Sequence, residues 1–327
     1  MTESRLPKTG RNWTEVKVAM EEARGSDLPW YDRKVFKPAY FTGDDVVEVA
    51  DRAYEMYMSD NLLYSRTSFP SLGRYEDEVV EMLLELLRAP SGAGGGLTTG
   101  GTESNVMAIK TARDWARLHR PGVTDPEIVA SETVHMSVDK AAHLLGLKLV
   151  KVGVTPDLRA DVDAMARAIN SNTILMIGSS PPYVYGEVDP SSDIAHLAED
   201  NDLWLHVDAC LGGFILPFAR KLGYPIPDFD FHVPAVTSIS IDLHKYGYAA
   251  KGVSALVLRD KNLDDYRGFA VQSLAGLYAT PNIVGSRSGG APASAWAVLQ
   301  YLGEEGYLQS VARILNIRQC FLDGIRA

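Results

Sequence analysis

The sequence predicts an α/β fold with a mostly parallel sheet covered by helices. Between residues 127 and 258, short apolar runs alternate with helical patterns, and several of these runs end directly in polar or small residues. Continuous apolar strands separated by helices are typical of a parallel sheet that is buried on both faces. Ligands bind at the carboxyl ends of the strands in such sheets, so we expect the functional site at that edge.

The chain begins with a region, residues 1–60, that we expect to form an N-terminal arm. Prolines and glycines interrupt it, and helical patterns fit near Glu15–Ala23 and Asp44–Met58. The next periodic helix covers Tyr75–Leu87 and ends before Pro90, because proline cannot continue a helix. The segment Ser91–Gly96 contains four glycines and is predicted to be a loop.

The alternating region supplies the sheet. The predicted strands are Glu127–Ser131, Lys148–Val154, Ile174–Gly178, Leu203–Asp208, Ser238–Asp242 and Ser254–Leu258. The predicted helices between them are Ser104–Leu118, Val138–Leu145, Val162–Ile169 and Ile194–Glu199. Helices between consecutive strands favour parallel pairing.

Composition excludes several classes of protein. The 327 residues include 32 Lys and Arg against 42 Asp and Glu, a net charge of −10, so a general nucleic-acid binder is not expected. The two cysteines form no disulfide framework and no zinc spacing, so we expect a reducing compartment and no metal. No apolar run approaches the roughly 20 residues that span a bilayer. We therefore expect a cytoplasmic protein without a transmembrane segment.

Two motifs offer contacts for an anion and for a flat ring. In Thr98–Asn105, Gly101 and Thr102 open a helix, where free backbone N–H groups could bind an anion or where the motif could simply cap the helix. His135 follows a predicted strand. Its imidazole could stack on an aromatic ligand or could be a structural group.

Two more motifs end predicted strands. Asp208 ends a buried strand, which calls for a cationic partner such as a pyridinium nitrogen unless the carboxylate caps the next turn. Lys245 follows another strand end, next to His244. Desolvation could remove its proton and make it a Schiff-base nucleophile, although most lysines are surface residues. Cys210 could be a thiol nucleophile, but no base is evident for it.

These motifs meet at one edge of the predicted sheet. An anion cradle, a stacking His, a strand-end Asp and a strand-end Lys match the phosphate, ring face, ring nitrogen and aldehyde of pyridoxal phosphate. The longer motifs that surround them are Thr99–Ser104, His206–Phe214, Thr237–Ser240, His244–Gly252 and Gly285–Gly290. With these motifs, the sequence resembles the fold-type I pyridoxal-phosphate enzymes of the group II decarboxylase-like branch, and among them the sphingosine-1-phosphate lyases.

The resemblance implies a role for each matching position. Lys245 would form the Schiff base with the cofactor, Asp208 would hold the pyridine nitrogen and His135 would stack on the ring. The residues implied to bind the cofactor phosphate are Gly101, Thr102 and His244. Lys251 would contact the phosphate of the substrate.

The resemblance also implies an activity and an assembly. The reaction would be retro-aldol cleavage of a phosphorylated long-chain base to a fatty aldehyde and phosphoethanolamine. The enzyme would be a homodimer, in which the Tyr278–Gly290 stretch completes the site across the interface. The large cofactor-binding domain would cover residues 61–290, and residues 291–327 would begin a C-terminal segment that leads to a small domain largely absent from this chain.

One position departs from the family pattern. Lyases of this kind carry Asn-Pro-Leu-His before a Phe-Pro turn, whereas this chain has Asn61-Leu62-Leu63-Tyr64 and one extra residue before Phe69-Pro70. Tyrosine brings no positive charge near neutral pH, so we expect a weaker phosphate site or a different substrate. Tyr183 and Tyr185 follow a predicted strand end and could also touch the substrate.

Two other functions stay open. An amino-acid decarboxylase would use the same cofactor contacts, with a cation for the distal group of its substrate in place of a phosphate clamp at Lys251 and Tyr183 or Tyr185. A non-catalytic binding protein would be colourless and would refuse added cofactor.

Overall fold

The computed structural model describes residues 6–28, 39–274 and 276–327. The chain divides into two compact units, Met1–Phe41 and Thr42–Ala327. In the first unit, the expected helix is present as α1 (Trp13–Arg24). The side chain of Asn12 accepts a hydrogen bond from the backbone N–H of Glu15, and the Glu15 carboxylate accepts one from the N–H of Asn12. This reciprocal pair fixes the start of the helix.

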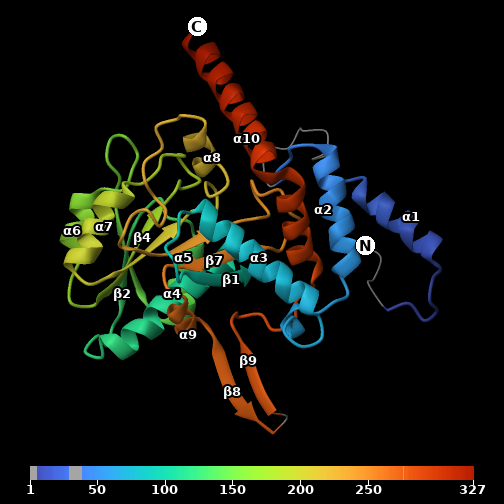
Figure 1. Cartoon of the computed structure of the whole chain (residues 1–327), viewed down its shortest axis with the longest axis horizontal. Helices are drawn as coiled ribbons and strands as arrows, with labels where there is room; N and C mark the ends of the chain where they lie inside the picture. Colours follow the sequence, from blue (N-terminus) through green and yellow to red (C-terminus); the bar gives the residue numbers. More distant parts are fainter. Residues whose placement is uncertain (1–5, 29–38, 275) are drawn as a thin grey trace. The chain divides into compact units, whose positions relative to one another are not determined.

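The second unit contains a seven-stranded sheet with the order β1-β7-β6-β5-β4-β2-β3 (Figure 1). Its strands are β1 (Gly94–Thr98), β2 (Glu127–Ser131), β3 (Lys148–Val152), β4 (Thr173–Ser179), β5 (Trp204–Asp208), β6 (Val236–Ile241) and β7 (Ser254–Leu258). Strand β7 is antiparallel to both of its neighbours, and the other pairs are parallel. The predicted α/β fold with a mostly parallel sheet is therefore confirmed.

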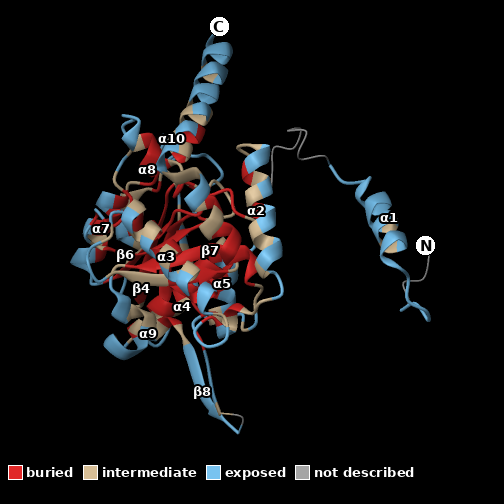
Figure 2. Cartoon of the chain, turned by 45° about the vertical axis from the view of Figure 1, so that its right-hand side comes forward, coloured by how far each residue is buried: buried red, intermediate tan, exposed pale blue. Residues whose placement is uncertain are grey.

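The helices of this unit are α2 (Asp44–Tyr57), α3 (Pro70–Leu86), α4 (Gly101–His119), α5 (Ser137–Leu145), α6 (Val162–Ala168), α7 (Ser191–Asp200), α8 (Leu216–Lys221), α9 (Asp264–Arg267) and α10 (Gly290–Arg326). Helices α3 to α7 pack against the sheet, whereas α2 and α8 pack on α10 and α9 packs on α4. Helix α4 crosses β1, β4, β5, β6 and β7 and is buried along most of its length. Figure 2 shows that buried residues concentrate in the sheet and in the helices beside it. Within the described ranges, no helix is both long and apolar enough to cross a membrane.

The prediction of a loop over Ser91–Gly96 was wrong, because part of that segment forms the edge strand β1. Its glycines permit close approach of neighbouring groups. A Cβ atom at Gly95 would lie 2.4 Å from the carbonyl oxygen of Leu256, and one at Gly96 would lie 2.6 Å from the guanidinium of Arg267. The glycine run therefore reflects tight packing at the sheet edge.

The C-terminal part adds two elements that the sequence reasoning did not predict. The hairpin of β8 (Phe269–Ser273) and β9 (Gly276–Thr280) projects away from the sheet (Figure 1). Helix α10 is interrupted at Gly303, whose φ of 54° and ψ of −173° are not helical. Beyond this kink, buried Tyr307 donates a hydrogen bond of 2.9 Å to the carbonyl of Gly247, two residues after Lys245.

Candidate functional site

A cavity of about 590 Å³ opens at the carboxyl ends of β4, β5 and β6, beside the first turn of α4. This is the edge at which α/β sheets bind ligands, and the volume suits a small molecule. The sequence-predicted residues that line it are Gly101, Thr102, His135, Tyr183, Asp208, His244 and Lys245. Segments from residue 99 to residue 284 thus contribute to a single cavity.

Lys245 is held in its charged form. Its Nζ atom lies 2.9 Å from a carboxylate oxygen of Asp242. Burial disfavours the ammonium ion, but the attraction of the Asp242 carboxylate outweighs that cost and raises the pKa of Lys245. The Asp242 carboxylate thus opposes the loss of the proton that desolvation was expected to favour at Lys245.

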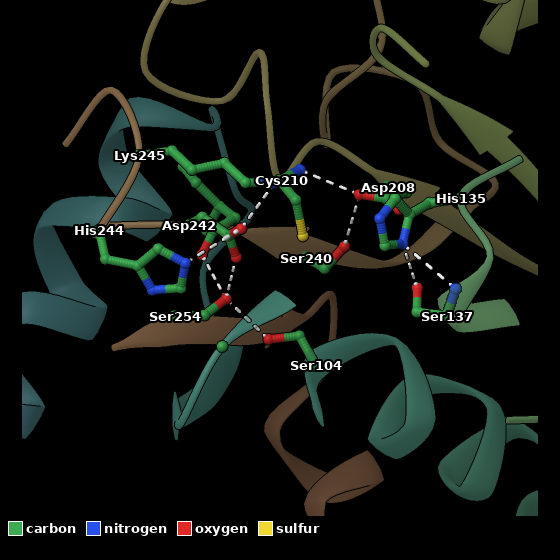
Figure 3. A network of polar contacts seen from close by, with 12 residues as sticks. Ser104, His135, Ser137, Asp208, Cys210, Ser240, Asp242, His244, Lys245 and Ser254 are labelled. Atoms are coloured by element: carbon green, nitrogen blue, oxygen red, sulfur yellow. Dashed lines mark hydrogen bonds and ion pairs between the residues drawn. The ribbon is translucent and has the colours of Figure 1, made fainter. Parts of the chain in front are cut away.

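Asp242 is itself fixed by a chain of hydroxyl groups (Figure 3). Its carboxylate is 2% exposed and accepts a hydrogen bond of 2.6 Å from Ser254. Ser254 is linked to Ser104 at 2.8 Å, and Ser104 to Thr98 at 2.7 Å. Sequence reasoning missed Asp242, although a carboxylate at the end of a buried strand is the signal that identified Asp208.

Asp208 is a buried carboxylate whose contacts are hydrogen bonds. Its oxygens accept from the backbone N–H of Cys210 at 3.0 Å and from the amide of Asn105 at 2.8 Å. Burial opposes the charge, yet these hydrogen bonds outweigh it and lower the pKa of Asp208. Over the described ranges, no lysine or arginine forms an ion pair with this carboxylate. The site therefore supplies a negative charge that a ligand cation can meet.

His135 lies between β2 and α5. The backbone N–H of Ser137 lies 3.2 Å from its Nδ1 atom, and the Ser137 hydroxyl lies 2.8 Å from the same atom. Because a backbone N–H can only donate, Nδ1 accepts and the imidazole carries its proton on Nε2. The ring of Tyr183 meets the imidazole edge-on, with centroids 5.6 Å apart. Both rings line the cavity.

The turn before α4 is tightly packed against the two carboxylate loops. A Cβ atom at Gly101 would lie 2.7 Å from Sγ of Cys210 and 2.8 Å from both carboxylate oxygens of Asp242. Glycine therefore lets the first backbone N–H groups of the helix face the cavity, where they favour an anion. His244 lines the same cavity, and its Nδ1 atom is buried without a hydrogen-bond partner. These features together suit a phosphate group.

Lys251 lies outside this cavity, in a neighbouring one of about 220 Å³. The two cavities share Thr99, and Arg287 lines the second one together with Lys251. The Lys251 ammonium donates a hydrogen bond of 2.7 Å to the carbonyl of His244, and burial lowers its pKa. Tyr64 is half exposed and lines neither cavity.

Comparison with known proteins identifies similar chains. The family model described as the pyridoxal-dependent decarboxylase conserved domain matches residues 30–327. The chain is 42% identical to the sphingosine-1-phosphate lyase of Arabidopsis thaliana, over 98% of this chain and 60% of the relative. It is 35% identical to the probable L-tyrosine/L-aspartate decarboxylase of Methanothermobacter thermautotrophicus, over 85% of this chain and 74% of that one.

A solved structure shares the fold. The sphingosine-1-phosphate lyase of Burkholderia pseudomallei superposes with a TM-score of 0.87 at 36% identity, covering 93% of this chain and 72% of the other. The present chain spans 60% of the length of its Arabidopsis relative.

Proposed function

The chain belongs to the pyridoxal-dependent decarboxylase family, and we propose that it is a pyridoxal-phosphate-dependent carbon–carbon lyase. Its substrate would be a phosphorylated long-chain base, which it cleaves to a fatty aldehyde and phosphoethanolamine. The observation that carries this proposal is the pair of adjoining cavities that share Thr99. One holds Lys245 for the amine chemistry, and the other holds Lys251 and Arg287 for a phosphate.

The residues of the first cavity fit the cofactor. Asp208 is a buried carboxylate that accepts hydrogen bonds only, which suits a protonated ring nitrogen. The close packing at Gly101 and the unpartnered Nδ1 atom of His244 suit the phosphate. Pyridoxal phosphate supplies an electron sink for bond cleavage next to an amine.

The side chains of the two cavities have different proposed roles. Asp208 would hold a proton at the ring nitrogen of the cofactor, and His135 would cover one face of the ring. Lys245 would provide the amine that binds the aldehyde. Its Nζ atom lies 2.9 Å from a carboxylate oxygen of Asp242, which holds the amine as an ammonium ion, so this proton has to leave before the amine reacts. Lys251 and Arg287 orient the distal phosphate of the substrate, with Tyr64 and Tyr183 as further proposed contacts.

We propose that the enzyme is a homodimer whose site is completed by the Tyr278–Gly290 stretch. The β8–β9 hairpin supports this, because its residues are coloured as exposed (Figure 2) and several of them are apolar. Phe269, Leu274 and Leu277 are each exposed by 60% or more.

A cytoplasmic location and domain boundaries near residues 60 and 290 are also proposals. Sedimentation, fractionation and limited proteolysis test these points.

Amino-acid decarboxylation is the second candidate, because the Methanothermobacter relative carries that name and is covered over 74% of its length. Its substrate carboxylate would bind the same cations. Both candidates are tested by mixing the full-length protein and pyridoxal phosphate with phosphorylated dihydrosphingosine, tyrosine or aspartate. Fatty aldehyde from the wild type and none from Lys245→Ala supports the lyase. Release of carbon dioxide from an amino acid, without fatty aldehyde, contradicts the lyase and supports the decarboxylase. Colourless protein that refuses the cofactor rejects both.

A further inference from the structure

Asn105 lies at the centre of the polar network under the cavity. It is 1% exposed and sits on α4, one turn after Gly101. The side chains that its amide group contacts are Ser137, His206, Asp208 and Ser240. These four contacts come from three elements that are far apart in the chain, so the amide connects β5, β6 and the start of α5.

The carboxylate of Asp208 determines which way the amide of Asn105 points. An ionised carboxylate only accepts hydrogen bonds, so the NH₂ group must face it, at 2.8 Å. The second N–H of that group then reaches the Ser137 hydroxyl, also at 2.8 Å. The carbonyl oxygen of the amide is left facing Nε2 of His206 at 3.2 Å, and that nitrogen must therefore carry a hydrogen.

The far side of His206 is compatible with the same tautomer. Its Nδ1 atom lies 2.9 Å from the hydroxyl of Ser238, which in turn accepts a hydrogen bond of 2.8 Å from the indole N–H of Trp204. The hydroxyl hydrogen of Ser238 is thus available to Nδ1. His206 is completely buried, and burial lowers its pKa to about 4, so the ring is neutral near pH 7.

The network also reaches His135. Ser137 accepts from Asn105, so its own hydroxyl hydrogen can be donated to Nδ1 of His135 at 2.8 Å. Asn105 therefore touches both groups that we expect at the cofactor ring, directly at Asp208 and through Ser137 at His135. Figure 3 shows the contacts of Ser137 with His135 and of Ser240 with Asp208.

We propose that Asn105 is a positioning residue that aligns Asp208 with His135, and that His206, held as its Nε2–H tautomer by Ser238, fixes the orientation of the Asn105 amide. The inference rests on the proposed function, because it assigns the aligned groups to the ring of pyridoxal phosphate. Its chemical content is a chain of donors that starts at Trp204 and ends on the carboxylate of Asp208. That chain adds the Asn105 amide to the Cys210 N–H as a donor to the carboxylate.

The tautomer is tested directly by nuclear magnetic resonance. Full-length protein labelled with ¹⁵N-histidine is measured near pH 7, before and after addition of pyridoxal phosphate, and the His206 signal is assigned by its loss in His206→Gln. We expect a neutral ring with its hydrogen on Nε2 in both spectra. A hydrogen on Nδ1, or a charged ring, contradicts the proposed chain of donors, whether or not the cofactor binds. If the Nε2–H tautomer is seen but the wild type does not bind the cofactor, the proposed function is contradicted. The assignment of Asp208 and His135 to the cofactor ring is then contradicted as well.

A matched pair of variants tests the link from His206 to the cofactor. The amide nitrogen of His206→Gln can occupy the position of Nε2 and still donate to Asn105, whereas that of His206→Asn falls near Nδ1. We expect the first variant to bind pyridoxal phosphate within about threefold of the wild type, and the second to bind it about tenfold to a hundredfold more weakly, as for a lost hydrogen bond in a charged network. Equal losses in both variants, at matched thermal stability, contradict the proposal.

Asn105→Asp provides the converse test without a change in size. A second carboxylate would face Asp208 at the position of the amide nitrogen and favour protonation of one of the pair. We expect cofactor binding to weaken by at least tenfold at pH 8 and to recover partly toward pH 6. Affinity equal to that of the wild type at both pH values would show that Asn105 does not position Asp208.

Discussion

The ammonium nitrogen of Lys245 and a carboxylate oxygen of Asp242 lie 2.9 Å apart at the carboxyl end of β6. Asp242 is buried and held by Ser254, so its carboxylate has a fixed position next to the lysine. The lysine is therefore held as an ammonium ion, and its proton has to leave before the amine can react.

Replacing Asp242 with asparagine should make Lys245 easier to deprotonate. The variant keeps the size of the side chain but removes the charge that opposes desolvation, so the pKa of Lys245 should fall. The rate of cofactor uptake, followed by absorbance between pH 6 and 10, should shift its rise to lower pH. Asp193→Asn, at an exposed position on α7, is the control. An unchanged pH profile would mean that Asp242 does not govern the lysine.

The same pair should affect stability with a defined pH dependence. The pKa of Lys245 in the folded protein is raised above its ordinary value of 10.5. The stabilisation is therefore fully present below about pH 10.5 and is lost as the pH rises through the higher folded-state value. Urea unfolding should show Asp242→Asn to be less stable by about 1 to 3 kcal/mol at pH 8, with the difference shrinking above pH 11. A difference that grows with pH would contradict this sign.

Gly101→Ala should damage the cofactor site. The added Cβ atom would lie 2.7 Å from Sγ of Cys210 and 2.8 Å from the Asp242 carboxylate, so the turn must move. We expect the dissociation constant for pyridoxal phosphate to rise about fivefold to a hundredfold, since such overpacking costs about 1 to 3 kcal/mol. Gly122→Ala is the matched control, because a Cβ atom there meets no other atom within 4 Å. Equal effects of the two substitutions would rule out a special packing role for Gly101.

Lys251→Gln should weaken binding of the substrate without affecting binding of the cofactor. Loss of the ammonium removes a charged contact to phosphate, which predicts a rise in KM of about tenfold to a hundredfold and unchanged cofactor uptake. Because burial lowers the pKa of Lys251, substrate affinity in the wild type should decline at alkaline pH as this group loses its proton. Lys221→Gln, on α8, serves as the control. Loss of the cofactor in Lys251→Gln would place this lysine in the other cavity.

Tyr64→His tests the position at which the chain departs from the family pattern. A histidine can carry a positive charge that tyrosine lacks, so inhibition by inorganic phosphate or phosphoethanolamine should become stronger below about pH 6.5. Inhibition constants measured for both proteins provide the comparison. The same constants in wild type and variant would remove Tyr64 from the proposed substrate site.

The sheet was largely predictable because its strands are uninterrupted apolar runs. Strands β2 and β7 match their predicted bounds, Glu127–Ser131 and Ser254–Leu258. Strand β1 was missed because a run of glycines has no side-chain pattern, and only its neighbours explain why glycine is needed there. The β8–β9 hairpin was missed because its exposed apolar residues carry no inward-facing alternation.

The same distinction holds in the site. Asp208 and Lys245 were found because a charged residue is unusual at the end of a buried strand. Asn105 ends the Thr98–Asn105 motif and Asp242 ends the predicted strand Ser238–Asp242, but neither was singled out. Their roles depend on partners from distant strands, such as His206 for Asn105, and no local pattern reveals those partners.

Tyr307 links helix α10 to the loop that carries Lys245, between β6 and β7. Its ring stacks on Phe218, and its hydroxyl bonds the carbonyl of Gly247, beyond the kink at Gly303. The loop cannot open locally without breaking that hydrogen bond and the stacking of Tyr248 on Tyr307, so loop and helix should unfold as one cooperative unit. Backbone amides of the loop should then exchange with deuterium no faster than those of α10 around Tyr307. The fold thus couples the mobility of its reactive amine to a helix more than fifty residues further along the chain.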